Sequence, residues 1–237
     1  MDEQFSRAAL LFGSDGIDRL NKSHVILFGV GGVGGYVAEA LARSGIGHIS
    51  LVDSDVVGIT NLNRQIIALH STIGRKKTEV MRDRILDINP DAEVTVHDCF
   101  FLPENADEFD FGSYDYVVDA VDTVTAKLEI IQRAKACGTP VISSMGTGDK
   151  TDPSALRIAD VFDTTECPLA RVMRRECRKR GISDLKVAFS TEIPNEHKEE
   201  TKEELPEGRR KIPGSTAFVP PAAGLIIASE VIKDLLG

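Results

Sequence analysis

One stretch, residues 24–65, constrains the fold of this 237-residue chain more than any other. It opens with an apolar run at 25–28, which is typical of a buried parallel strand. Three glycines then form the pattern G-x-G-x-x-G: Gly29, Gly31 and Gly34. We expect a helix after them, and then a second strand over residues 48–52 that ends at Asp53. Strand, glycine turn, helix, strand and acid in this order predict a nucleotide-binding βαβ unit.

The residues after Asp53 distinguish this unit from a simple dinucleotide-binding domain. Asp55 follows two positions later, either as a cap of the turn after the second strand or as part of a phosphate site. Asn61 and Arg64 belong to the run N-L-N-R-Q, and Lys77 ends the run G-R-K-K. Fixed cations at Arg64 and Lys77 would suit the charge of a triphosphate.

The pattern along the rest of the chain indicates the fold class. Strand and helix signals alternate, which predicts an α/β, Rossmann-like fold with a mainly parallel twisted sheet and helices on both faces. A strand at 114–119 ends in Asp119 and is followed by Asp122, at the sheet edge where ligands bind and where a carboxylate can hold Mg²⁺ on phosphates. We expect a single domain over residues 1–237, with a mobile charged loop at 192–214.

Composition limits the class of protein. The formal net charge of −9 argues against bulk non-specific nucleic-acid binding, though not against a local basic face. No apolar run approaches the roughly 20 residues of a membrane span, and no signal-peptide pattern opens the chain, so we expect a cytoplasmic protein. None of the cysteines stands in a C-x-x-C motif, which excludes a tetrathiolate zinc site. They are Cys99, Cys137, Cys167 and Cys177.

Taken together, these motifs resemble those of the ThiF and E1-like adenylating enzymes, which activate ubiquitin and its bacterial sulfur-carrier relatives. The shared pattern is G-x-G-G-x-G, D-x-D-x-V, N-L-x-R-Q, G-x-x-K and D-x-x-D, in this order. The resemblance implies that ATP is the cofactor and that Asp53 holds its ribose. It implies that Asn61, Arg64 and Lys77 hold the triphosphate, and that Asp122 lies at the Mg²⁺ and the α-phosphate.

The segment R-A-A-L-L-F-G near the start of the chain resembles the N-terminal arm of the same family. In that family, an arginine of the arm reaches the ATP of the partner subunit. The resemblance therefore implies a homodimer in which Arg7 acts in trans.

Residues 167–180 predict a helix with one apolar face and one cationic stripe. The stripe consists of Arg171, Arg174, Arg175 and Arg178. An isolated stripe of this kind is usually a solvated surface. Here the helix is followed by V-x-F-S-T-E-x-P and G-S-T-A-F-V-P-P-x-A-G, and the whole resembles the bacterial tRNA threonylcarbamoyladenosine dehydratases. The resemblance covers nearly the whole chain and implies that the stripe binds the phosphates of the tRNA anticodon arm.

This resemblance implies a specific reaction, the ATP-dependent cyclisation of N6-threonylcarbamoyladenosine in tRNA. The threonine carboxylate attacks the α-phosphate of ATP and forms an acyl-adenylate and pyrophosphate. The side chain's own nitrogen then closes the ring and expels AMP, with net loss of water. Arg64, Lys77 and a trans Arg7, together with Mg²⁺, would neutralise charge at the reacting phosphorus. Relatives of the family also suggest a partner in sulfur transfer, such as a cysteine desulfurase or a sulfur acceptor.

Three alternatives account for part of the sequence. The first is adenylation of the C-terminal glycine of a ubiquitin-like or sulfur-carrier protein, in which Cys167 at a helix start would form the thioester. We interpret Cys167 instead as a buried or idle thiol. The second, a nicotinamide-dependent oxidoreductase, explains the glycines and Asp53 but leaves N-L-N-R-Q and G-R-K-K without a role. The third is a non-catalytic nucleotide-binding scaffold.

Overall fold

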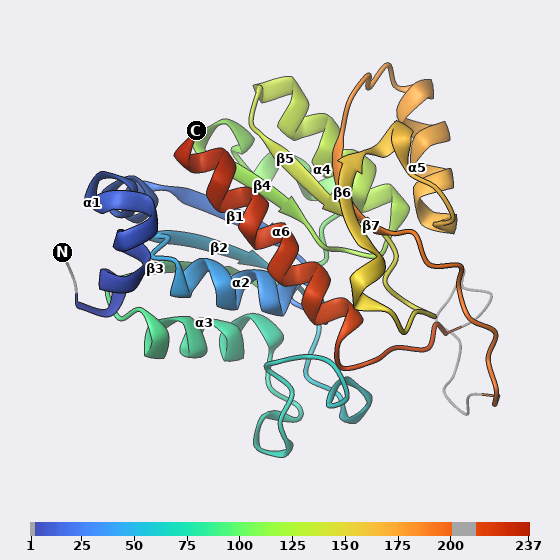
Figure 1. Cartoon of the computed structure of the whole chain (residues 1–237), viewed down its shortest axis with the longest axis horizontal. Helices are drawn as coiled ribbons and strands as arrows, with labels where there is room; N and C mark the ends of the chain where they lie inside the picture. The colour runs from blue at the N-terminus through green and yellow to red at the C-terminus, as the bar shows by residue number, and fades with distance from the viewer. Residues whose placement is uncertain (1–2, 201–211) are drawn as a thin grey trace.

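The computed structural model describes residues 3–200 and 212–237, and within them a single seven-stranded sheet forms the centre of the molecule (Figure 1). The strand order is β3-β2-β1-β4-β5-β7-β6. Every neighbouring pair is parallel except β6 and β7, which run antiparallel at one edge. The strands are β1 (His24–Phe28), β2 (His48–Val52), β3 (Glu93–His97), β4 (Tyr116–Asp119), β5 (Val141–Ser144), β6 (Leu156–Asp160) and β7 (Lys186–Ser190). The predicted α/β fold with a mainly parallel sheet is confirmed.

Helices cover both faces of this sheet. The helices α1 (Ser6–Lys22), α2 (Gly34–Arg43), α3 (Lys77–Ile88) and α6 (Val219–Leu236) lie on one face, and α4 (Val124–Cys137) and α5 (Pro168–Lys179) lie on the other (Figure 1). Strand β1 shows why both faces must be covered. Its Val25 and Leu27 belong to the core under α2, α3 and α6, whereas Ile26 and Phe28 belong to the core under α4. Successive side chains of a strand point to opposite faces, so a continuous apolar strand needs a layer on each side.

The core under α4 contains a cluster of aromatic rings close to the carboxyl end of β1. The ring of Phe28 lies 4.8 Å from that of Phe101, 5.6 Å from that of Phe109 and 5.7 Å from that of Phe111, measured between centroids. Offset and edge-on rings at such distances add to the free energy of burial. This cluster fixes the end of β1 and the segment after β3 relative to one another, and both border the site described below.

Two helices contain a proline or glycine that shapes them. Helix α6 begins at Val219, and Pro220 and Pro221 occupy its first turn. Proline is tolerated there, since the first backbone N–H groups of a helix have no partner within the helix. Helix α1 is interrupted at Gly13, whose φ of 74° is not helical. No helix in the described ranges is long and apolar enough to cross a membrane.

The predicted mobile loop at 192–214 falls partly outside the described residues, which omit 201–211, so its mobility stays a prediction. The described parts carry no helix or strand. Glu192 accepts hydrogen bonds from the backbone N–H groups of Thr151 (3.0 Å) and Asp152 (2.9 Å), and the buried Lys150 donates to the Glu192 carbonyl oxygen at 2.5 Å. The beginning of the loop is therefore attached to the segment after β5.

Candidate active site

A cleft of about 410 Å³ opens at the carboxyl ends of β1, β2, β4 and β5. Its lining comes from segments that are far apart in the sequence: the glycine turn after β1, residues 52–55, 61–65, 99–101, 120–123 and 144–148, and the described residues 213–215. This is the edge at which open α/β sheets bind their ligands. It brings together most of the residues that the sequence singled out.

The glycine turn has the steric requirements that its pattern predicts. Gly29 has a φ of 90°, and a Cβ there would lie 2.8 Å from the carbonyl oxygen of Ala120. At Gly34 a Cβ would lie 1.8 Å from the carbonyl oxygen of Gly29, so only glycine permits this approach of helix to turn. At Gly31, in contrast, the nearest atom to a Cβ is Nε2 of Gln65, at 3.9 Å. The backbone at Gly31 is thus open to the cleft, beside the N-terminus of α2, where a phosphate can be received.

Asp53 lies at the end of β2 and lines the cleft. Its Oδ2 accepts a hydrogen bond from the backbone N–H of Val30 at 2.7 Å, and its Oδ1 accepts one from that of Asp55 at 2.8 Å. Burial raises the pKa of the Asp53 carboxyl above its ordinary value of 3.8, against the charge of Lys77 and the two N–H donors, which lower it. The carboxylate is held rigidly at the position where a ribose hydroxyl can donate to it.

Lys77 and Asp55 form an ion pair in the wall of the cleft. Nζ of Lys77 lies 2.7 Å from Oδ2 of Asp55, and the Lys77 side chain is only 7% exposed, while that of Asp55 is 64% exposed. The backbone N–H of Lys77 also donates to the carbonyl oxygen of Asp55 at 3.0 Å. The turn after β2 is closed by the side chain of Asp53, which accepts from the Asp55 N–H, whereas the Asp55 side chain directs the Lys77 ammonium. A phosphate-site role for Asp55 stays a prediction.

Arg64 and Asn61 lie on the segment between β2 and α3, and both line the cleft. The side-chain oxygen of Asn61 accepts from the backbone N–H of Gly58 at 3.0 Å, which closes the turn before it. Nη1 of Arg64 donates to the carbonyl oxygen of Thr60 at 2.9 Å and to Oδ1 of Asn63 at 2.8 Å. These hydrogen bonds support a guanidinium at the cleft, and the planar fork of a guanidinium matches the geometry of phosphate oxygens.

Of the two acids at the end of β4, Asp119 and Asp122, only Asp122 lines the cleft. The carboxylate of Asp119 is buried and accepts from Nζ of Lys127 at 2.9 Å. Among the described residues no group of three or more His, Cys, Asp or Glu could hold a metal ion. A single carboxylate at a phosphate site nevertheless fits the way in which Mg²⁺ is usually bound, through one or two carboxylates together with substrate phosphates.

Several cleft residues were not singled out as site residues from the sequence. Gln65 lines the cleft, is only 7% exposed, and its Oε1 has no hydrogen-bond partner among the described residues, so a ligand can occupy that acceptor. Residues 99–101 and 144–148 follow β3 and β5 and belong to the same sheet edge. The rule that ligands lie at the carboxyl ends of strands could have indicated these two segments. Residues 213–215 also reach the cleft from a distant part of the chain. Gly214 and Ser215 begin the motif G-S-T-A-F-V-P-P-x-A-G, but the motif by itself does not indicate a position at the cleft.

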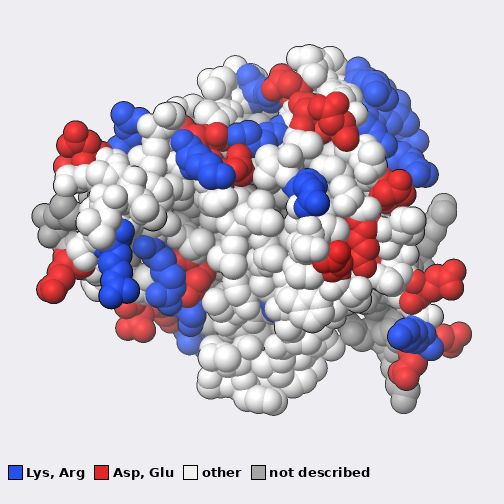
Figure 2. All heavy atoms as spheres, in the orientation of Figure 1, with Lys and Arg blue, Asp and Glu red and all other residues white. Residues whose placement is uncertain are grey.

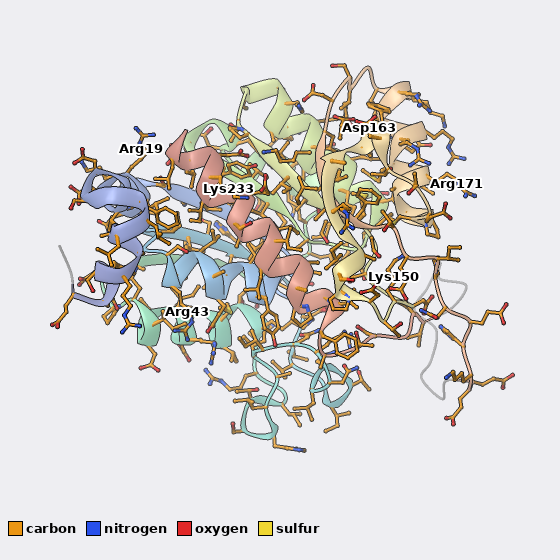
Figure 3. The ribbon with its side chains drawn as sticks, viewed as in Figure 1. Arg19, Arg43, Lys150, Asp163, Arg171 and Lys233 are labelled. Carbon is orange, nitrogen blue, oxygen red and sulfur yellow. The ribbon has the colours of Figure 1, made fainter. Side chains whose placement is uncertain are left out.

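The predicted cationic stripe lies on α5, and Figure 2 shows Lys and Arg side chains gathered over this helix at the upper right. Arg171, Arg175 and Arg178 are exposed, and Arg171 projects outward from the helix (Figure 3). Arg174 differs, because it is half-buried and its Nη1 donates to the carbonyl oxygen of Thr164 at 2.8 Å. Arg174 thus anchors α5 to the preceding segment, while the other three arginines face outward.

One acid interrupts this cationic surface. Hydrogen bonds from Arg180, Lys179 and Arg175 lower the pKa of Glu176 to about 2, so its carboxylate is ionised at neutral pH. Arg178 lies over the ring of Phe162, with 5.1 Å between Cζ and the centroid. The surface is therefore preorganised, although part of its charge is balanced internally.

Cys167 and Arg7 lie outside the lining of the cleft. Cys167 immediately precedes α5 and is 3% exposed, and a Cβ at Gly146 would lie 3.9 Å from its sulfur. A thiol buried in this way is poorly placed for attack on a protein substrate. Arg7 is exposed on α1, on the same face of the sheet as α6, and does not line the cleft of its own chain.

The geometry of the cleft agrees with comparisons to known proteins. Residues 5–237 match the model of the ThiF family. The chain belongs to the ThiF family. Within this family, the chain is 46% identical over 244 residues to the tRNA threonylcarbamoyladenosine dehydratase of Bacillus subtilis. The alignment covers 100% of this chain and 96% of that relative. The resemblance to ThiF-like enzymes and to the bacterial dehydratases is confirmed.

Solved structures of the ThiF family extend this finding to the fold. The crystal structure of the Escherichia coli tRNA N6-threonylcarbamoyladenosine dehydratase in complex with AMP is similar with a TM-score of 0.89 and 33% identity, over 99% of this chain and 94% of that one. The complex of the same Escherichia coli enzyme with ATP gives a TM-score of 0.88 with the same identity and coverage. These relatives bind the nucleotides that the cleft of this ThiF-family chain is suited to hold.

Proposed function

We propose that this protein catalyses the ATP-dependent cyclisation of N6-threonylcarbamoyladenosine in tRNA through an acyl-adenylate. The observation that carries the proposal is the 46% identity to the Bacillus subtilis dehydratase over 100% of this chain and 96% of that relative. The cleft supports it, because it combines a glycine turn for phosphates with Asp53, Arg64, Lys77 and Asp122. Such a set suits activation of a carboxylate by a nucleoside triphosphate.

The roles in the proposed mechanism follow from the positions of the side chains. Asp53 accepts hydrogen bonds from the ribose, and the backbone at Gly31 with the N-terminus of α2 binds phosphate. Arg64 and Lys77 neutralise the charge that develops as pyrophosphate leaves. Asp122 would hold Mg²⁺, which when bound polarises the phosphate oxygens. Ring closure is intramolecular, so the reaction requires no nucleophile from the protein, in keeping with the buried position of Cys167.

The tRNA partner is proposed to lie on α5. Leu169 in the first turn of this helix lines the cleft, and the exposed Arg171, Arg175 and Arg178 follow on the same helix. Phosphates bound by the arginines would therefore place the modified base close to the cleft. A local cationic surface on a chain with a net charge of −9 favours a partner held at one face.

A homodimer is also proposed, with Arg7 completing the cleft of the partner. Large apolar side chains are exposed on the segment after β2 and near the start of α6: Val56, Ile59, Leu69, Ile73, Phe218 and Leu225. Figure 2 shows a wide region without charged side chains around the lower part of the molecule. An exposed apolar surface of this kind supports association with a second copy. A cytoplasmic location and a sulfur-transfer partner stay predictions.

Adenylation of a small carrier protein is the second candidate, because the ThiF family includes enzymes of that kind. The test measures the release of AMP and pyrophosphate from ATP in three separate reactions. One contains tRNA that carries threonylcarbamoyladenosine, one contains the same tRNA without that modification, and one contains a ubiquitin-like carrier. The proposed function predicts that AMP and pyrophosphate are released only in the reaction with the modified tRNA. Release with the carrier alone would replace it by carrier activation, and release of ADP would exclude adenylation.

A further inference from the structure

The cleft rests on a buried ion pair that has no place in the mechanism described so far. Lys127 lies one turn into α4, and its side chain and that of Asp119 are both 0% exposed. Nζ of Lys127 lies 2.9 Å from Oδ2 of Asp119, 2.7 Å from the carbonyl oxygen of Ser144 and 3.3 Å from Oγ of Ser143. An ammonium has three N–H donors, and here each of them has an acceptor.

The same network continues toward the cleft. Oγ of Ser143 donates to Oδ2 of Asp119 at 2.5 Å, and the backbone N–H of Val121 donates to Oδ1 of Asp119 at 3.2 Å. Neither Lys127 nor Asp119 lines the cleft, but the two loops that they bind, residues 120–123 and 144–148, both do. The first of these loops carries Asp122. The pair therefore joins the ends of β4 and β5 and the start of α4 immediately behind the reacting region.

We propose that Lys127 and Asp119 are positioning residues for adenylation, which set the distance between Asp122 and the loop at 144–148. The inference rests on the proposed function, because that function places Asp122 beside the phosphates of ATP. The cost of transferring two charges into the interior often cancels their mutual attraction, so stability alone is a weak reason for such a pair. Its complete set of hydrogen bonds instead gives the two loops one fixed arrangement.

Geometry can be separated from electrostatics because the pair has no net charge. The double variant D119N/K127M removes both charges, leaves the net charge at the cleft unchanged and leaves no ion buried without a partner. Any loss of function in a folded double variant then reports the position of the two loops. A single substitution would not allow this conclusion, because it leaves one buried charge uncompensated.

A second ion pair provides the matched control. Nε of Arg84 on α3 lies 2.5 Å from Oε2 of Glu39 on α2, Glu39 is largely buried, and neither residue lines the cleft. The control variant E39Q/R84Q removes this pair, which joins two helices elsewhere in the same domain, together with the contact of Glu39 with Arg43. It therefore shows what the loss of a partly buried ion pair does to the protein without a change behind Asp122.

The experiment measures melting temperature, AMP affinity, affinity for ATP with Mg²⁺, and turnover with modified tRNA for the wild type and both double variants. D119N/K127M is expected to lose at least about tenfold in kcat and in ATP affinity, because small displacements at a reacting centre are costly. AMP affinity measured without Mg²⁺ should stay within about twofold, because Asp53 and the glycine turn bind AMP, whereas Asp122 acts through Mg²⁺.

The control variant should keep all three functional values, including kcat. An unchanged kcat and ATP affinity in D119N/K127M, or an equal loss in E39Q/R84Q, would overturn the positioning role. A wild type that binds ATP but converts no modified tRNA would instead contradict the proposed function, and the ATP-affinity comparison between the variants would still decide the role of the pair.

Discussion

Lys77 and Asp55 form the ion pair that fixes the cationic side of the cleft, with 2.7 Å between Nζ and Oδ2. The Asp55 carboxylate would repel an anionic ligand, so we assign it the role of holding the buried Lys77 ammonium in position. We predict that Asp55→Ala lowers kcat about tenfold, because Lys77 loses its fixed position. Asp55→Asn keeps an acceptor oxygen and should lose less. Equal activity of both variants and the wild type, measured as AMP formation, would contradict this role.

Arg64 is expected to contribute to turnover and not to folding. Arg64→Ala should lower kcat by about 10²–10³-fold, which is the usual cost of removing one donor from a developing charge. Its melting temperature should stay close to that of the wild type, because the side chain is partly exposed and packs on its own loop. Arg75→Ala is the control, since Arg75 pairs with Asp83 outside the cleft. Retained AMP formation by folded Arg64→Ala would remove this residue from the mechanism.

Gly34 and Gly31 of the turn should respond differently to alanine. Gly34→Ala places a Cβ 1.8 Å from a carbonyl oxygen, so it should unfold the turn and lower the melting temperature. Gly31→Ala meets no atom closer than 3.9 Å and should fold normally. Its methyl group would occupy the space that a phosphate needs, so ATP affinity should fall at least about tenfold. Normal ATP affinity of Gly31→Ala by calorimetry would show that phosphate binds elsewhere.

Asp53 should give nucleoside binding a pH dependence of defined sign. Ionised Asp53 accepts from the ribose, and burial raises the pKa of its carboxyl above 3.8. Affinity should therefore decrease as the pH is lowered toward this raised pKa, beginning at a higher pH than for an ordinary aspartate. Adenosine is the suitable probe, because it has no phosphate that titrates in the same range. The Asp53→Asn variant should bind weakly with no such dependence, and a parallel decrease in both proteins would assign the titration to another group.

The α5 surface should affect tRNA binding alone. The double variant R171E/R175E is expected to weaken tRNA binding and to reduce the slope of log K against log salt by about one for each phosphate that the helix no longer binds. ATP affinity should not change, since neither residue lines the cleft. Lys233→Glu on α6 is the control, because this exposed residue lies away from α5 (Figure 3). An unchanged tRNA affinity and salt slope would exclude the helix from the interface.

The parts of the site that sequence alone predicted are those that local chemistry determines. Gly29 and Gly34 are required by close backbone approaches around one βαβ unit, so their spacing carries the information. Two features depend on how distant segments pack against each other. Arg174 is anchored to Thr164, and Asp119 is buried against Lys127. Helical periodicity and strand position in the sequence do not predict such contacts. Residues 213–215 reach the cleft only because the chain returns from β7 to α6 across it.

The proposed reaction removes one molecule of water from threonylcarbamoyladenosine in tRNA. The most direct measurement is mass spectrometry of nucleosides from such a tRNA after incubation with the protein, ATP and Mg²⁺. The proposed function predicts that the modified adenosine loses the mass of one water molecule, and only when ATP is present. An unchanged mass, under conditions where the protein binds ATP and the tRNA, would contradict it.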